Sequence, residues 1–240
     1  MAIPQAKITA NVKKKVKVDW QQQIASLRAG PEPQRFYLSR LVGPLMIGVS
    51  FDTKSFNNEY YPGFDCQTLL EIRDHLGRTL SKDLMNSRIN IAGDKIDFIV
   101  SISVNRHEKG DYIEAAQLMK EQALLPLEGP ISISMIADAY QQYAKRPGTS
   151  FQMALIQDPA LIAAWGGRND LAQKYLDWGY ETYKGWMANR RNLEIDDNPD
   201  EWLKTMQARI ADPEMLRQNV KEMIAKHKLD YLPQEDLILE

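Results

Sequence analysis

Residues 95–104 read Lys-Ile-Asp-Phe-Ile-Val-Ser-Ile-Ser-Val, with an apolar side chain at every second position from Ile96 to Val104. This period of two is typical of a strand with one buried face, because successive side chains of an extended backbone point to opposite sides. Residues 88–92 precede it, and Gly93-Asp94, a favoured pair for a two-residue turn, separates the two segments. We therefore predict an antiparallel hairpin. Its predicted buried face comprises Ile96, Phe98, Val100, Ile102 and Val104.

The segments upstream of this hairpin contain one more strand signal and several helix signals. The apolar run PLMIGVSF at residues 44–51 predicts a buried strand. Residues 60–63, Tyr-Tyr-Pro-Gly, are typical of a turn, and Asp65 after them is predicted to cap a helix. A short helix is predicted at residues 81–85, and a first helix at residues 18–29. Two prolines, at positions 31 and 33, end that first helix.

Downstream of residue 104 the sequence favours helices. Asp111 and Glu114 form a capping-box pattern before an apolar face, a short strand is predicted at residues 131–134, and a helix follows. From residue 158 onward three Asx-Pro pairs predict helix starts, because proline fits the first turn of a helix. The pairs are Asp158-Pro159, Asn198-Pro199 and Asp212-Pro213. A long helix is also predicted to begin at Asn169, after Gly166-Gly167.

These patterns predict an α+β fold, with a small antiparallel sheet flanked by helices in the N-terminal part and an all-helical C-terminal third. We divide the chain into a basic arm at 1–17, a mixed α/β region at 18–148 and a helical region at 149–240. The helical region is expected to pack on the mixed region as one compact unit. With 240 residues, 44% of them hydrophobic and 26% charged, the chain can bury a core of ordinary size.

Composition also restricts location and partners. The first 50 residues carry eight lysines or arginines against two acidic residues, a net charge of +6, and the whole chain has −2, so the remainder has −8. One cysteine excludes an intrachain disulfide and suits a reducing compartment. The first residues lack the pattern of a secretion signal, and no apolar run approaches the roughly 18–20 residues that cross a bilayer. We expect a cytoplasmic protein that does not bind membranes.

Motifs for common chemistries are missing from the sequence. Three separate histidines, His75, His107 and His227, form no zinc-binding pattern, and they are expected at the surface. An EF-hand-like opening at Asp196, Asn198 and Asp200 lacks the glycine and the final glutamate of a calcium loop. No phosphate-binding glycine loop and no serine-hydrolase motif occurs. We therefore predict no cofactor, no metal and no specific binding of nucleic acid by the lysines at 13–17.

Two short features remain compatible with catalysis. Cys66 is predicted in the first turn of the helix capped by Asp65, where the helix dipole lowers a thiol pKa. His107 would have to supply its base, so a buried structural role is preferred. Asp52 and Lys54 follow the strand at 44–51 as the D-x-K half of a metal-dependent nuclease core. The alternative function is therefore a metal-dependent nuclease or another hydrolase that uses Asp52 and Lys54.

The leading hypothesis is a non-enzymatic protein-binding module, such as a bacterial toxin-neutralising (immunity) protein or an adaptor. Tryptophan is enriched at binding hot spots, and nearby carboxylates would suit a basic partner protein. The candidate contact residues are Trp178, Trp186, Asp196, Asp197 and Trp202. A second alternative is a self-associating structural protein, in which residues 237–239 add to the sheet edge of a neighbour. The sequence does not indicate an oligomeric state.

Overall fold

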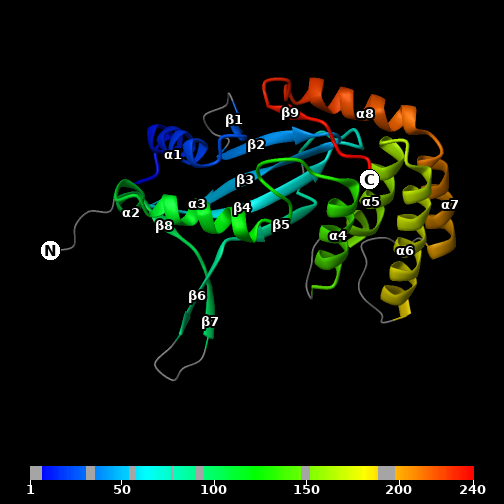
Figure 1. Cartoon of the computed structure of the whole chain (residues 1–240), viewed down its shortest axis with the longest axis horizontal. Helices are drawn as coiled ribbons and strands as arrows, with labels where there is room; N and C mark the ends of the chain where they lie inside the picture. Colours follow the sequence, from blue (N-terminus) through cyan, green and yellow to red (C-terminus); the bar gives the residue numbers. More distant parts are fainter. Residues whose placement is uncertain are drawn as a thin grey trace.

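The computed structural model describes residues 7–30, 36–53, 58–76, 78–89, 95–146, 152–188 and 198–240 (Figure 1). The α+β prediction is confirmed. One sheet has the strand order β1 (Arg28–Ala29), β2 (Tyr37–Val42), β3 (Leu45–Thr53), β4 (Glu59–Thr68) and β5 (Leu80–Asp83). Two short strands extend it, β8 (Ile102–Ser103) beside β4 and β9 (Gln234–Glu235) beside β2. All these pairs are antiparallel except β2–β9.

Helices α1 (Ala10–Gln23), α2 (Val104–Glu108) and α3 (Asp111–Gln122) lie near one end of the sheet in Figure 1. Helices α4 (Ile133–Ala144), α5 (Gln152–Trp165), α6 (Asn169–Ala188), α7 (Pro199–Ile210) and α8 (Pro213–Lys226) gather at the other end. In the described ranges, no helix has the length and apolar character needed to span a membrane.

The apolar face of the sheet forms the centre of the core. Strand register puts opposite residues on the same face, so Ile47 and Cys66 share a face, as do Val49 and Phe64. Trp20 of α1 packs edge-on against Phe51 on this side, with ring centroids 5.1 Å apart. Arg40 is also fully buried; it donates to the carbonyl groups of Pro126 and Gly129 and pairs with Glu235. Arg40 thus attaches the C-terminal strand β9 to the sheet.

The predicted hairpin is confirmed as β6 (Met85–Ile89) and β7 (Lys95–Ile99), an antiparallel pair that projects from the body in Figure 1. Gly93-Asp94 lies outside the described residues, but Ile89 pairs with Lys95, which a two-residue turn at 93–94 would not allow. On the predicted buried face, Phe98 and Val100 are half-buried and Ile102 is buried. The prediction of a single strand over residues 95–104 was wrong beyond Ile99, because Ile102 belongs to β8 and Val104 begins α2.

The reading of residues 60–85 was wrong. Residues 60–63 form no turn and Asp65 caps no helix, because both lie in strand β4, and β5 replaces the short helix predicted at 81–85. Pro62 is tolerated because β5 pairs with β4 only from Gly63 onward, so the missing N–H falls where the ladder has ended. In place of the predicted strand at 131–134, Ser132 caps α4.

The predicted helix starts at Asn169, Asn198 and Asp212 are confirmed, and the side chains of Asn198 and Asp212 cap α7 and α8. The helix start predicted at Asp158-Pro159 was wrong, because α5 begins at Gln152 and continues through both residues. The first helix begins at Ala10 and not at residue 18, so Lys13 to Lys17 lie on α1 and not in an arm.

Candidate functional site: a polar pocket on the sheet

The second face of the sheet carries small and polar side chains in place of a packed apolar layer. Residues at alternate positions of β3 point to this side, and the register places Gly48 opposite Asp65 and Ser50 opposite Gly63. On β2, Ser39 lies opposite Gly48. The side chains of Ser39 and Ser50 are short, and they line a hollow at this point.

This hollow is a pocket of about 840 Å³. Its floor is formed by β2, β3 and β4, one wall by the connection between β4 and β5, and the far end by Lys13 of α1 and Phe36. The side chains that carry its chemistry are Ser39, Ser50, Asp52, Asp65, Gln67, Asp74, His75, Arg78 and His227. Small-molecule sites in proteins have volumes of roughly 300–1,000 Å³, so the pocket has the size of such a site.

Asp65 is the central ionisable group of the floor. Its side chain is 21% exposed, and Arg78 pairs with it at 3.1 Å between Nε and Oδ1. Burial raises the pKa of Asp65 to about 6, which exceeds the lowering effect of Arg78 and of the hydrogen bond from Ser50. The nearby charges of Asp52 and Asp83 raise this pKa further. Asp65 therefore changes its protonation state close to neutral pH.

Arg78 connects two carboxylates. Its Nη1 and Nη2 atoms donate to the two oxygens of Asp52 at 3.1 and 3.0 Å, while its Nε faces Asp65. The hydrogen bond with Asp52 is the main reason why the pKa of Arg78 is raised. The guanidinium group thus contacts both acids, and its two hydrogen bonds hold Asp52 at the mouth of the pocket.

Two buried polar side chains, Ser39 and Gln67, belong to the floor of the pocket. Ser39 is 3% exposed and its side chain lines the pocket. Gln67 is 6% exposed, and its amide donates to the sulfur of Met46 at 3.3 Å, which is a weak acceptor. A hydroxyl and an amide can each donate and accept hydrogen bonds, so both side chains offer polar groups to a molecule in the pocket.

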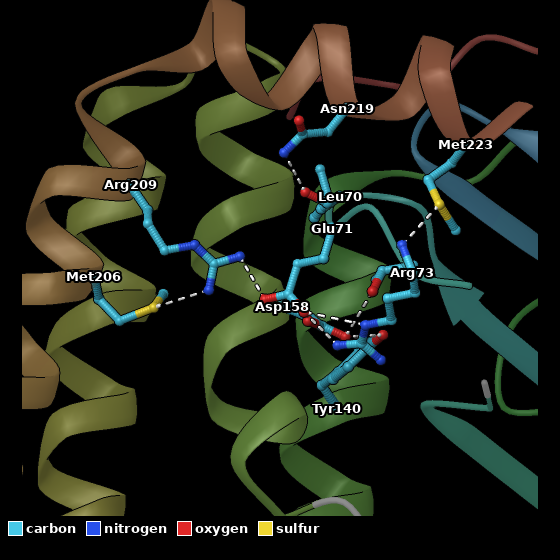
Figure 2. A network of polar contacts seen from close by, with 10 residues as sticks. Leu70, Glu71, Arg73, Tyr140, Asp158, Met206, Arg209, Asn219 and Met223 are labelled. Carbon is cyan, nitrogen blue, oxygen red and sulfur yellow. Dashed lines mark hydrogen bonds and ion pairs between the residues drawn. The ribbon is translucent and has the colours of Figure 1, made fainter. Parts of the chain in front are cut away.

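The wall of the pocket is anchored on the helical third. Asp74 pairs with Lys226 at 2.8 Å, and the carbonyl of Arg73 is 3.0 Å from Nε2 of His227, at the end of α8. Figure 2 shows the network behind this wall, where Glu71 pairs with Arg73 and with Arg209 of α7. Asn219 of α8 donates to the Leu70 carbonyl at 2.9 Å. The C-terminal helices therefore hold the β4–β5 connection over the sheet.

A second ionisable cluster lies in the core and not in the pocket. Asp158 of α5 accepts hydrogen bonds from Tyr140 of α4 at 3.0 Å and from Thr68 at 3.3 Å (Figure 2). Burial is the main cause that raises the pKa of Asp158 to about 7. Asp158 is 5% exposed and Tyr140 fully buried, so this cluster joins the helices to the sheet without access for a ligand.

His107 belongs to a third polar network, which lies in the core and not at the surface. Its Nδ1 lies 2.7 Å from the Tyr60 hydroxyl, its Nε2 lies 2.8 Å from Asp19, and Trp20 donates to Tyr60 at 3.0 Å. The expected surface position of His107 was wrong, since the residue is only 3% exposed. Burial lowers the pKa of His107, and the network joins α1 and α2 to the sheet.

Cys66 does not lie on a helix. It is a fully enclosed residue of β4, and burial raises the pKa of its thiol well above the usual value. His107, the base that a catalytic cysteine would have needed, is engaged with Tyr60 and Asp19. Cys66 therefore has the environment of an inert structural thiol.

The residues predicted for a protein contact are dispersed. Trp186 and Trp202 are buried, at 7% and 4% exposure, and form part of the core, while Trp178 is half-buried. Asp196 and Asp197 lie outside the described residues, and so does Lys54 of the D-x-K pair. The C-terminal residues proposed for self-association pair within the chain, with Ile238 bridged to Ser132. Among the residues that the sequence analysis singled out, Asp52, Cys66, His75 and His227 line the pocket.

Sequence reasoning missed Asp65, Arg78 and the serines of the floor. Part of the signal was present, because in LMIGVSFDT of β3 the apolar residues alternate with Met, Gly, Ser and Asp. That alternation predicts a strand with one apolar and one small or polar face. Among the described residues, no group of three or more His, Cys, Asp or Glu side chains is arranged to hold a metal ion.

Comparison with known proteins finds no family model, no curated protein and no solved structure that matches the chain. The function must therefore be inferred from the pocket.

Proposed function

We propose that this protein binds a small, uncharged, polar molecule in the pocket on the sheet. The observation that carries the proposal is the pocket of about 840 Å³, whose lining presents the hydroxyl groups of Ser39 and Ser50 and the amide of Gln67. A ligand with several hydroxyl or amide groups could form hydrogen bonds with these side chains, each of which can donate and accept.

The charges of the pocket favour an uncharged ligand. Arg78 is neutralised by Asp52 and Asp65, and Asp74 by Lys226. Lys13, at the far end, lies over the ring of Phe36 at 5.3 Å from its centroid. A charged ligand would have to displace one of these pairs, whereas a neutral one needs only hydrogen bonds and the aromatic surface of Phe36 and Tyr37.

The test is ligand-observed NMR on the full chain with two sets of probes. The neutral set contains glycerol, D-glucose, D-xylose and adenosine, and the charged set contains glucose 6-phosphate and AMP. We expect saturation transfer to a member of the neutral set. Ser50→Trp should abolish this signal by filling the pocket, and Gln207→Trp, on the exposed side of α7, should leave it unchanged. Absence of binding by every neutral probe contradicts the proposal, and so does equal binding by the two variants.

A second candidate function is binding to another protein. The surface for it is smaller than the sequence analysis predicted, because only Trp178 of the predicted contact residues is described and not buried. Half-buried Trp178 lies on α6 near the exposed carboxylates Asp177 and Glu181, a combination that suits a basic partner. An immunity or adaptor role falls within this proposal. Trp178→Ala should weaken capture of such a partner by the immobilised protein, and Trp178→Phe should largely retain it. The single cysteine suits a reducing compartment, so we propose a cytoplasmic location.

A further inference from the structure

Asp65 occupies an unusual position for a carboxyl group that only supports a fold. It lies on a central strand, on the floor of the pocket, where its partners are the Ser50 hydroxyl and the Arg78 guanidinium. It is mostly buried, and the residues paired with it on the neighbouring strands, Gly48 and Ser81, are small. A molecule that fills the pocket therefore lies directly over a carboxyl group.

We propose that Asp65 is the acid–base residue of this pocket, which accepts a proton from, or returns one to, a hydroxyl group or a water molecule held over it. In the forward step the O–H bond of that group breaks, its proton binds to a carboxylate oxygen of Asp65, and the electron pair stays on the ligand oxygen. The reverse step returns the proton. This inference rests on the proposed binding of a polar molecule in the pocket.

The charged groups around Asp65 agree with this role. They are Arg78 from the β4–β5 connection, Asp52 from β3 and Asp83 from β5. Arg78 favours the carboxylate and the two acids oppose it, while burial favours the neutral acid. An acid–base group works best when its pKa lies near the working pH, and the balance of these effects brings Asp65 there.

Reactivity of the free protein tests the inference without a known ligand. A water-soluble carbodiimide adds to protonated carboxyl groups, and glycinamide then converts the adduct to an amide that peptide mass spectrometry assigns. A carboxyl with a pKa of about 6 loses about tenfold in protonated fraction between pH 5 and pH 7, and one with a pKa below 4 loses about a hundredfold. Asp74, on the rim of the same pocket with a lowered pKa, is the internal reference.

We expect the labelling rate of Asp65 relative to Asp74 to rise about tenfold from pH 5 to pH 7. Arg78→Met should keep Asp65 protonated to higher pH, whereas Arg106→Met, at an exposed ion pair with Asp111, should not change the profile. The inference is overturned if the ratio of the Asp65 and Asp74 labelling rates is the same at pH 5 and pH 7. It is also overturned if Asp74 is labelled and Asp65 is not. The variants are compared by circular dichroism to establish that they fold. If no neutral probe binds in the NMR experiment but the labelling of Asp65 depends on pH as expected, the proposed binding is refuted. If a probe binds but the ratio of the Asp65 and Asp74 labelling rates does not change with pH, only the acid–base role is refuted.

Discussion

The hydroxyl of Tyr140 and the carboxyl of Asp158 lie 3.0 Å apart in the core, where α4 and α5 meet the sheet. Thr79 joins the same cluster through the Tyr140 hydroxyl at 3.0 Å, and Thr68 through Asp158. Thr68 is the last residue of β4, the strand that carries Asp65, and Thr79 directly precedes β5. The stability of the contact between helices and sheet is thus linked to the protonation of Asp158.

The first prediction follows from the raised pKa of Asp158, about 7 in the folded chain against an ordinary value of 3.8. The folded state holds this proton more tightly than the unfolded state. The stabilisation is therefore complete below pH 3.8 and is lost as the pH rises through about 7. This difference in pKa corresponds to roughly 4 kcal/mol in the free energy of unfolding. Asp158→Asn should therefore be more stable than the wild type at pH 8, and this advantage should disappear near pH 4. Urea unfolding measures this; Asp138→Asn, at an exposed position of α4, should show no such trend.

The second prediction concerns the close approach of Gly48 to its neighbouring strand. A Cβ atom at Gly48 would lie 1.9 Å from the backbone oxygen of Leu38, whereas one at Gly63 has its nearest neighbour at 3.5 Å. Gly48→Ala should therefore destabilise the protein by about 3 kcal/mol or more, because the sheet must shift. Gly63→Ala, on the same face, should cost much less. Equal unfolding midpoints of the two variants in urea would contradict this account of the sheet.

The third prediction tests the network around Tyr60. Removal of its hydroxyl in Tyr60→Phe leaves the indole N–H of Trp20 and the Nδ1 atom of His107 without their partner in the core. An unmet buried polar group costs about 1–3 kcal/mol, so the free energy of unfolding should fall by at least that amount. Tyr61→Phe is the matched control, because the Tyr61 hydroxyl bonds the half-exposed Glu59. A loss in the control as large as that in Tyr60→Phe would refute the prediction.

The fourth prediction is that the Cys66 thiol is inert in the folded protein. Burial encloses the sulfur and raises its pKa, and both effects suppress the reactive thiolate. Iodoacetamide at pH 8 should modify native Cys66 far more slowly than the same residue in urea. Introduction of an exposed cysteine, Ser134→Cys, provides the comparison, and mass spectrometry resolves the two sites. Rapid modification of native Cys66 would show that the strand opens or that the thiol is accessible.

Local sequence determined the elements whose signals act over a few residues. The side chains of Asn198 and Asp212 each accept a hydrogen bond from a backbone N–H three residues further along their own helix. The hairpin at residues 85–99 likewise follows from alternation along two neighbouring segments. Such features depend on neighbouring residues, so the sequence alone predicted the caps and the presence of the hairpin, but not the register of its strands.

Tertiary structure decided the features for which local signals conflicted with burial. Residues 60–68 contain turn-forming residues, yet they pair along their length with β3 and form a central strand. Pro159 lies within α5, whose buried packing among the other helices outweighs the roughly 3 kcal/mol that an interior proline costs. The pocket has the same origin. Asp52, Asp65 and Arg78 come from two strands and a connection, and only the register of the sheet brings the two carboxylates to one guanidinium.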